Sequence, residues 1–267
     1  MDGKLRAVAQ VYFGIVGIIG LITGAVLIAL PASTESYFAW PIAPAQTALF
    51  MGAGYLGTGL TLLGILAFGR SWSDARLIVP PVAIFAFTMI GATLLHRDRF
   101  FWDRIVTWLW LGLYFVILAG AAGVELAHRH AATDDPIIAM TRWERAALVT
   151  VGILTAAWAV PLYVAPAVAS SLWPWTLSPL TSRVVAGWIA VAAALALTGG
   201  LLNDARSLRL PLLGWLITVL AFLVTSAASM PKASRAGMLA SVYFAALGFF
   251  VLGSLWLLAR IRRRLPH

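Results

Sequence analysis

The chain has 267 residues, of which 61% are hydrophobic and 11% are charged, whereas a soluble domain is about half apolar and a quarter charged. This composition excludes an ordinary soluble domain and indicates a chain that faces lipid. The formal net charge of +9 would suggest a nucleic-acid partner in a soluble protein, but basic cytoplasmic loops explain it better in a membrane protein, so we expect no nucleic-acid partner. The absence of cysteine excludes disulfides, thiolate catalysis and cysteine-ligated metals.

Eight apolar runs follow one another along the chain, separated by charged residues, because a charged side chain at the centre of a bilayer costs several kcal/mol. Each run has about the 20 residues that a helix needs to cross the hydrocarbon core. The runs predict an all-α polytopic transmembrane helical bundle with spans at Ala7–Leu30, Thr47–Phe68, Leu77–Leu95, Ile105–Val124, Ala146–Ala165, Val184–Leu202, Pro211–Ala228 and Met238–Ala259.

Lysine and arginine are divided unequally between the two sets of loops. Thirteen of them flank the chain termini and the loops on the same side, and six flank the opposite ends of the spans. Because cytoplasmic loops retain Lys and Arg, the pattern predicts an inner or plasma membrane protein with both termini in the cytoplasm. The arginines between Arg260 and Arg264 are expected to contact anionic lipids as well.

The first four spans resemble the last four. Trp40-Pro41 recurs as Trp173-Pro174, and Asp74-Ala75-Arg76 recurs as Asp204-Ala205-Arg206. An even number of spans in each copy makes the copies parallel, so residues 1–130 and 131–267 are predicted to be two four-span repeats of one membrane domain. The second and sixth spans are rich in small residues, which favours a place near the centre of the bundle.

Three classes of function remain open at this point. The duplication favours a small-solute permease with a site between the repeats, and the candidate cavity residues are Gln46, Tyr55, Thr58, Thr61, Thr198 and Asn203. The alternative is a non-catalytic membrane subunit or scaffold that binds a partner protein, a second copy or lipid. A lipid-modifying enzyme comes third, because no nucleophile with a base and no carboxylate pair is visible, and we expect no catalytic residue, cofactor or metal.

Two further pairs of segments are candidates for moving parts. The proline-broken aromatic segments on the outer side suggest a lid or a partner surface made of Trp40, Pro44, Trp173, Trp175 and Arg183. The two Asp-Ala-Arg triplets suggest a cytoplasmic gate made of Asp74, Arg76, Asp204 and Arg206, although helix capping by Asp and phosphate contact by Arg also explain them.

Histidines and aspartates are concentrated in the longest cytoplasmic loop. His128 and His130 are followed by Asp134 and Asp135, but their spacing matches no familiar zinc pattern. We therefore expect a solvated polar loop.

The string from Phe38 to Pro44, with Gly52-Ala53-Gly54-Tyr55 after it, resembles one that recurs in uncharacterised membrane proteins of high-GC bacteria. The resemblance implies a bacterial membrane setting and no particular activity.

Overall fold

The computed structural model describes residues 5–69, 71–130, 137–230 and 237–264. Within these ranges every regular element is helical, and eight segments are long and apolar enough to cross a membrane, which confirms the predicted all-α bundle. The long helices are α1 (Ala7–Ala29), α3 (Ala45–Phe68), α5 (Val79–Leu95), α6 (Ile105–His128), α7 (Arg142–Val164), α9 (Pro179–Leu202), α10 (Ala205–Ser229) and α11 (Met238–Arg262). The third span joins α5 to α4 (Trp72–Ala75) and the 3-10 turn η1 (Arg76–Ile78).

Several helices begin before the apolar run that predicts them, because a polar residue caps their first backbone N–H groups. Thr141 Oγ1 accepts from Glu144 N at 3.3 Å and starts α7. Asp204 caps α10, so the seventh span begins at Ala205 and not at the predicted Pro211. Pro211 lies inside the helix, as prolines in membrane spans often do when neighbouring groups satisfy the freed carbonyl.

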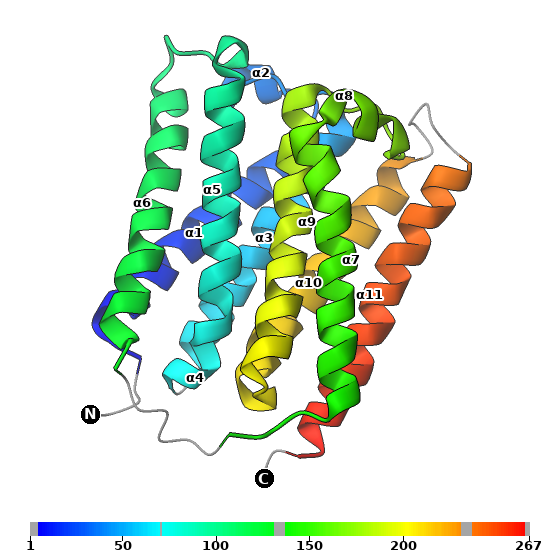
Figure 1. Cartoon of the computed structure of the whole chain (residues 1–267). Helices are drawn as coiled ribbons and strands as arrows, with labels where there is room; N and C mark the ends of the chain where they lie inside the picture. The colour runs from blue at the N-terminus through cyan, green and yellow to red at the C-terminus, as the bar shows by residue number, and fades with distance from the viewer. Residues whose placement is uncertain (1–4, 70, 131–136, 231–236, 265–267) are drawn as a thin grey trace.

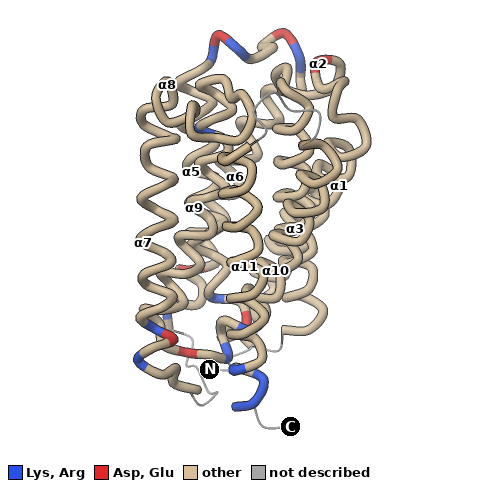
Figure 2. The backbone as a smooth tube through the Cα atoms, turned by 90° about the vertical axis from the view of Figure 1, so that its right-hand side faces the viewer, with Lys and Arg blue, Asp and Glu red and all other residues tan. Residues whose placement is uncertain are grey.

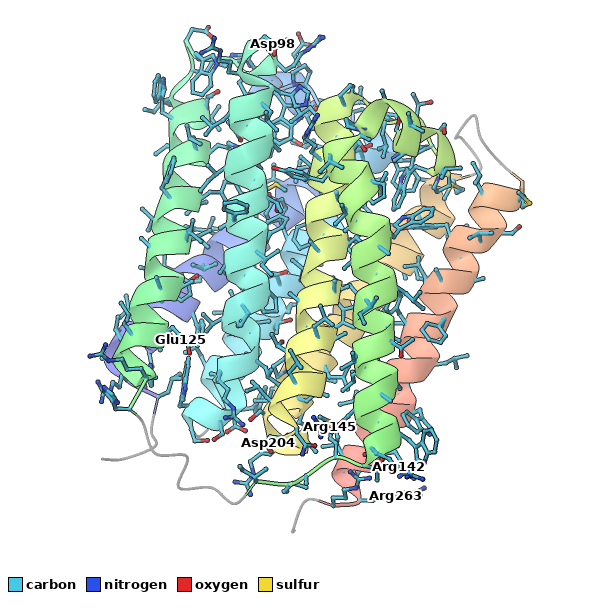
Figure 3. All side chains as sticks on the ribbon, viewed as in Figure 1. Asp98, Glu125, Arg142, Arg145, Asp204 and Arg263 are labelled. Carbon is cyan, nitrogen blue, oxygen red and sulfur yellow. The ribbon has the colours of Figure 1, made fainter. Side chains whose placement is uncertain are left out.

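Both chain ends lie at one end of the bundle, which we call the terminal end (Figure 1). The short helices α2 (Thr34–Tyr37) and α8 (Pro166–Ala169) lie at the other, or opposite, end. Charged residues gather at these two ends, and the tube between them carries very few (Figure 2). Asp98 lies at the opposite end, whereas Glu125, Arg142, Asp204 and Arg263 lie at the terminal end (Figure 3).

The two halves of the chain form corresponding helix pairs. α1 packs along α3, and α7 packs along α9, and these are the most extensive helix contacts in the described chain. α5 packs on α6, and α10 packs on α11. The halves join where α3 meets α10 and where α5 meets α9, with α3 and α9 also touching.

The centre of the bundle is built from closely packed helices with small residues. α3, α5 and α9 are the most buried spans, whereas α1, α7 and α11 face outward, so the small residues of α3 and α9 correctly predicted their central place. A Cβ added at Gly57 would lie 2.1 Å from Thr218 Oγ1, and one added at Gly214 would lie 2.0 Å from Thr61 Oγ1. Glycine at these two positions therefore lets α3 and α10 approach closely.

Candidate functional site

A cavity of about 680 Å³, which we call the first cavity, lies among α1, α3, α5, α6, α9 and α10. Its volume is in the range of pockets that hold small molecules. The described residues that line it are mostly aliphatic or aromatic, and none of them is charged. The second half of the chain contributes Trp188, Val191, Leu195, Pro211, Trp215 and Thr218, so the cavity reaches the junction of the two halves.

Exposed residues of both α1 and α6, Ile22 and Leu109 among them, line the first cavity, so it opens sideways between these two helices. The two helices are in contact where Tyr12 Oη, near the terminal end of α1, donates to Ile117 O in the middle of α6 at 2.9 Å. They diverge toward the opposite end, and α1 runs obliquely behind α6 in Figure 1. Leu109 and Val116 of α6 line the cavity and are 63% and 65% exposed, so they border its mouth. In a membrane this mouth faces lipid hydrocarbon.

Few polar groups line the first cavity, and most of them are bonded within the protein. Tyr55 and Tyr114 share a short hydrogen bond between their hydroxyl groups. Thr61 and Thr218 each donate to the carbonyl four residues earlier in their own helix, at 2.7 Å and 2.9 Å. These bonds leave walls that suit hydrocarbon better than water.

The six predicted cavity residues separate into two groups. Tyr55, Thr58 and Thr61 line the first cavity. The other three bond to backbone groups elsewhere: Gln46 Nε2 donates to Ser229 O at 2.9 Å, Thr198 Oγ1 donates to Ala194 O at 2.6 Å, and Asn203 Oδ1 accepts from Met140 N at 3.1 Å. Asn203 ends α9 with a φ of 53°, a left-handed conformation that asparagine tolerates.

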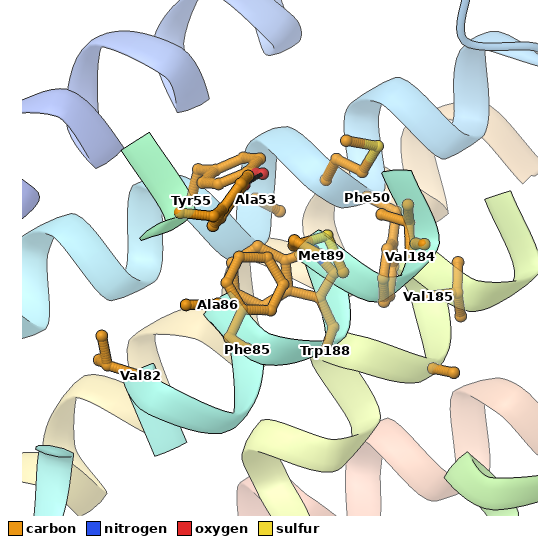
Figure 4. Packing of buried hydrophobic residues seen from close by; sticks show 14 of the residues in the cluster. Phe50, Ala53, Tyr55, Val82, Phe85, Ala86, Met89, Val184, Val185 and Trp188 are labelled. Atoms are coloured by element: carbon orange, nitrogen blue, oxygen red, sulfur yellow. Dashed lines mark hydrogen bonds between the residues drawn. The ribbon is translucent and has the colours of Figure 1, made fainter. Parts of the chain in front are cut away.

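Aromatic rings form the deep wall of the first cavity. Phe85 lies against Trp188 with ring centroids 4.1 Å apart, and Tyr55 stands edge-on to Trp188 at 5.2 Å (Figure 4). Sequence reasoning did not select Trp188 or Tyr114 as site residues. In the sequence, each of them is a large aromatic residue in the middle of an apolar span. Ordinary core packing explains such a residue as well as a binding site does.

A second, smaller cavity of about 270 Å³ lies among α7, α9, α10 and α11. Its lining includes Glu144 near the start of α7 and Trp256 near the end of α11, so it lies toward the terminal end. Leu195 and Trp215 line both cavities. These two side chains therefore form the partition between the first and the second cavity.

The predicted outer lid is folded into the bundle. Trp40, Trp173 and Trp175 are buried, so their rings pack inside the protein. Trp175 Nε1 donates to Thr47 Oγ1 at 3.0 Å, so the outer segment of the second half contacts α3 of the first half. Pro44 follows a cis peptide bond and precedes the first residue of α3.

Arg183, the remaining member of the predicted outer surface, contacts α5 from α9. Its Nη1 forms a hydrogen bond with His96 Nε2 at the end of α5. Burial and then the positive charge of Arg183 lower the pKa of His96 below its ordinary value of 6.5. The imidazole is therefore neutral at physiological pH and accepts a hydrogen bond from the guanidinium.

The two Asp-Ala-Arg triplets meet at the terminal end. Arg76 Nη2 lies 2.7 Å from Asp204 Oδ2, which joins the first triplet to the second. Arg206 N donates to Asp204 Oδ1 at 3.2 Å, and Asp74 accepts from Ser71 N at 3.3 Å in the capping box of α4. Helix capping and a contact between the halves thus occur together in these residues.

Glu144 binds two arginines of the cluster that was predicted to contact anionic lipid. The side chain is 1% exposed, Arg260 Nε lies 2.9 Å from its Oε1, and Arg264 donates to both of its oxygens at 2.8 Å. A bidentate arginine–carboxylate pair is among the stronger polar contacts in proteins. These bonds tie the terminal-end turns of α7 and α11 together, a role that sequence reasoning did not anticipate.

His128 is buried, so the prediction that it lies in a solvated loop is wrong. It belongs to the last turn of α6, and its ring stacks on Trp72 with centroids 4.2 Å apart. Its Nε2 accepts from Arg6 N at 3.2 Å, and its Nδ1 lies 2.8 Å from a carbonyl of the preceding turn, which places the proton on Nδ1. Asp134 and Asp135 lie outside the described residues.

The fold and the lipid-facing cavity define the chain as a multi-pass helical membrane protein. No protein-family model, curated protein or solved structure matches it.

Proposed function

We propose that the chain binds a lipophilic molecule, which enters the first cavity from the bilayer between α1 and α6. The observation on which this proposal rests is the 680 Å³ apolar cavity, two of whose lining residues, Leu109 and Val116, are also exposed on the outer surface of the bundle. Lipid tails are as apolar as the cavity wall, so the hydrophobic effect contributes little to such binding. Close contact with the aromatic wall has to supply the affinity.

For both leading interpretations of the sequence, the permease and the scaffold, the cavity limits the ligand to a lipophilic molecule. A permease for a polar solute needs polar groups along its path, whereas Thr61 and Thr218 donate to their own helices. A scaffold that binds lipid needs an apolar groove that lipid can reach, and the first cavity has that form. Binding of a lipophilic molecule is therefore the function that the geometry favours.

Gly112 provides the test of this proposal. It lines the first cavity, and a Cβ added there would meet no atom within 4 Å. In proteoliposomes that contain a diazirine-bearing fatty alcohol, we expect illumination to label the deep wall, including the peptide that holds Trp188. Gly112→Leu should remove this labelling because the leucine side chain fills the cavity near its mouth.

Gly123 is the matched control on the same helix. A Cβ there also meets no atom within 4 Å, but Gly123 does not line the first cavity. Gly123→Leu should therefore keep the labelling of the deep wall. Equal labelling in the two variants would refute the proposal.

A second candidate function is permeation of the same lipophilic molecule, and the wall shared by the two cavities favours it. The first cavity reaches the opposite end at Tyr37 and Phe38, whereas the second lies toward the terminal end. Movement of Leu195 and Trp215 would join them into one apolar path between the leaflets. The binding proposal does not depend on this path.

Substitution of Gly253 distinguishes permeation from binding. It lines the second cavity, and neither it nor Gly248 on the same helix has an atom within 4 Å of an added Cβ. Gly253→Leu should slow the transbilayer movement of a fluorescent ceramide in proteoliposomes and keep the labelling of the first cavity, whereas Gly248→Leu should change neither. Equal ceramide movement with and without the protein would exclude permeation and leave binding in place.

We further propose that residues 1–130 and 131–267 are parallel repeats. Trp110 Nε1 donates to Thr93 Oγ1 at 3.1 Å, and Tyr243 Oη bonds to Ser226 Oγ at 2.9 Å. Each pair joins the third and fourth spans of its half, and in both pairs the partners are 17 positions apart in the sequence. The two bonds support duplication independently of the Trp-Pro and Asp-Ala-Arg matches.

The proposed orientation has the terminal end in the cytoplasm of a bacterial cell. This end holds the described arginines Arg6, Arg76, Arg129, Arg142, Arg145, Arg206, Arg209, Arg260, Arg262, Arg263 and Arg264, and the opposite end holds Arg97, Arg99, Arg104 and Arg183. The excess agrees with the retention of Lys and Arg on the cytoplasmic side. Reporter fusions after residues 34, 130 and 267 test it, and a cytoplasmic signal at the first site would contradict it.

A further inference from the structure

Exposed residues of both α7 and α11 line the second cavity, so it opens sideways between these two helices. They are Ala147 of α7 with Phe249 and Trp256 of α11. Toward the terminal end, Glu144 of α7 binds Arg260 of α11 and joins the two helices beside this mouth. In a membrane the mouth of the second cavity therefore faces the lipid of the leaflet at the terminal end.

The second cavity contains an unpaired hydroxyl group. Ser254 is 5% exposed and lines the cavity, and its Oγ forms no hydrogen bond within the described chain. Thr198 and Thr218 show the usual alternative, a bond to the carbonyl four residues earlier in the same helix. The described chain has four unpaired polar atoms that protein encloses completely, and Ser254 Oγ is not one of them, so this hydroxyl keeps accessible surface. At a residue this deeply buried, that surface belongs to the cavity that the residue lines.

Arg260 supplies further donors at the mouth of the second cavity. Its side chain is 42% exposed, and its Cζ lies 5.7 Å from the centroid of the Trp256 ring. Its Nε binds Glu144, whereas Nη1 and Nη2 have no hydrogen-bond partner within the described chain. Gly253, Trp256 and Arg260 follow one another at intervals of three and four residues, so they lie along one flank of α11 that runs from the cavity to these donors.

The charge beside this mouth is strongly positive. The adjoining segments 142–145 and 260–264 contain six arginines and one acidic residue, Glu144. An anionic ligand is therefore favoured over a neutral or cationic one. The planar guanidinium of arginine matches phosphate in particular, because two of its N–H groups can bind two phosphate oxygens at once.

From these observations we infer that the second cavity is a site for an anionic phospholipid of the leaflet at the terminal end. Arg260 binds the phosphate, Ser254 Oγ donates to an ester carbonyl, and one acyl chain enters the cavity. A volume of about 270 Å³ is smaller than most pockets for small molecules, so it holds part of one chain and not a whole lipid. This inference does not depend on the ligand of the first cavity.

The spacing of the two polar contacts agrees with the structure of a phospholipid. Two glycerol carbons separate the phosphate oxygen from the nearest ester oxygen. Ser254 precedes Trp256, the residue beside the guanidinium of Arg260, by two positions, which is about 3 Å along the helix axis. A phosphate on Arg260 therefore places the ester near the level of Ser254, with the chain directed into the cavity.

Native mass spectrometry of the delipidated protein in detergent, titrated with dioleoyl phosphatidylglycerol, tests the phosphate contact. Arg260→Gln should raise the Kd of the first bound lipid by about tenfold, the effect of losing hydrogen bonds between charged groups. Arg129 is an exposed arginine at the terminal end of α6 that lines neither cavity, so Arg129→Gln should leave this Kd unchanged. Equal Kd values for the two variants would overturn the inference.

Two further arms of the same titration test the acyl chain. Gly253→Leu fills the second cavity and should lose the first bound lipid, whereas Gly248→Leu, which does not line this cavity, should keep it. Inorganic phosphate at millimolar concentration should not displace the lipid, because the chain contributes to binding. Retention of the lipid by Gly253→Leu, or its displacement by phosphate, would show that the headgroup binds alone and that the inference is wrong.

An ether-linked phosphatidylglycerol with chains of the same length tests the ester contact. We expect the wild-type protein to bind the diester about fivefold more tightly than the diether, the effect of one hydrogen bond. Ser254→Ala should lose this preference, and Ser241→Ala, at an exposed position of the same helix, should keep it. A preference that survives in Ser254→Ala would refute the role of this serine.

The outcomes also separate this inference from the proposed function. Arg260, Ser254 and Gly253 do not line the first cavity, so their variants should keep the diazirine labelling of its deep wall. Failure of the phospholipid site would therefore leave lipophile binding in place, and failure of the labelling would leave the phospholipid site in place.

Discussion

The contact between α3 and α10 makes a quantitative prediction. Alanine at Gly57 would place its Cβ 2.6 Å from Thr218 Cβ and 2.7 Å from Thr218 Cα. Carbon atoms pack at about 3.5–4.0 Å, so the two helices must separate by roughly 1 Å. No rotation of the Thr218 side chain relieves this contact, because Cα belongs to the backbone. Overpacking of this kind costs about 1–3 kcal/mol, and helix association in lipid depends on such packing.

Thermal unfolding in detergent, followed by fluorescence-detected size exclusion, measures the effect. Gly57→Ala and Gly214→Ala should each lower the unfolding midpoint by about 2–10 °C. Gly64, also on α3, has no atom within 4 Å of an added Cβ, so Gly64→Ala should leave the midpoint unchanged. If Gly57→Ala unfolds at the same temperature as Gly64→Ala, the reasoning about this interface is wrong.

Three polar contacts make further predictions. Glu144→Gln weakens the bonds to Arg260 and Arg264 and should lower the free energy of unfolding by about 1–3 kcal/mol, whereas Glu125→Gln, at an exposed position, should cost nothing measurable. Asp204→Asn should speed hydrogen exchange at the N–H of Ile138, which lies 3.4 Å from Asp204 Oδ1, and the exposed substitution Asp98→Asn should not. Because the folded state favours neutral His96, the stability from this group is present above pH 6.5 and is lost as pH falls through its lowered pKa. His96→Asn should flatten that part of the pH–stability profile, and an unchanged profile would contradict the contact with Arg183.

The amino-acid sequence determined the spans and their number. A chain segment in hydrocarbon must satisfy every backbone group internally, so an apolar run of sufficient length has to be a helix wherever the chain folds around it. The central place of α3 and α9 followed from their small residues for a similar reason, since only small side chains let helices approach closely in lipid. These inferences depend on residues near one another in the chain.

Only the tertiary structure decided which polar groups meet. Arg76 pairs with Asp204 across 128 residues, and Glu144 pairs with Arg264 across 120 residues. The burial of His128 depends in the same way on Trp72 and Arg6. Periodicity and composition describe one helix at a time, so they contain no information about which helices these residues bring together.

The first cavity depends on the tertiary structure even more strongly. It exists because α1 and α6 diverge beyond Tyr12, and Trp188 reaches it from the other half of the chain. Each of its aromatic residues has the sequence signature of an ordinary core residue. A cavity is a volume that neighbouring helices leave unfilled, so helix crossing angles decide it and the content of a single span does not.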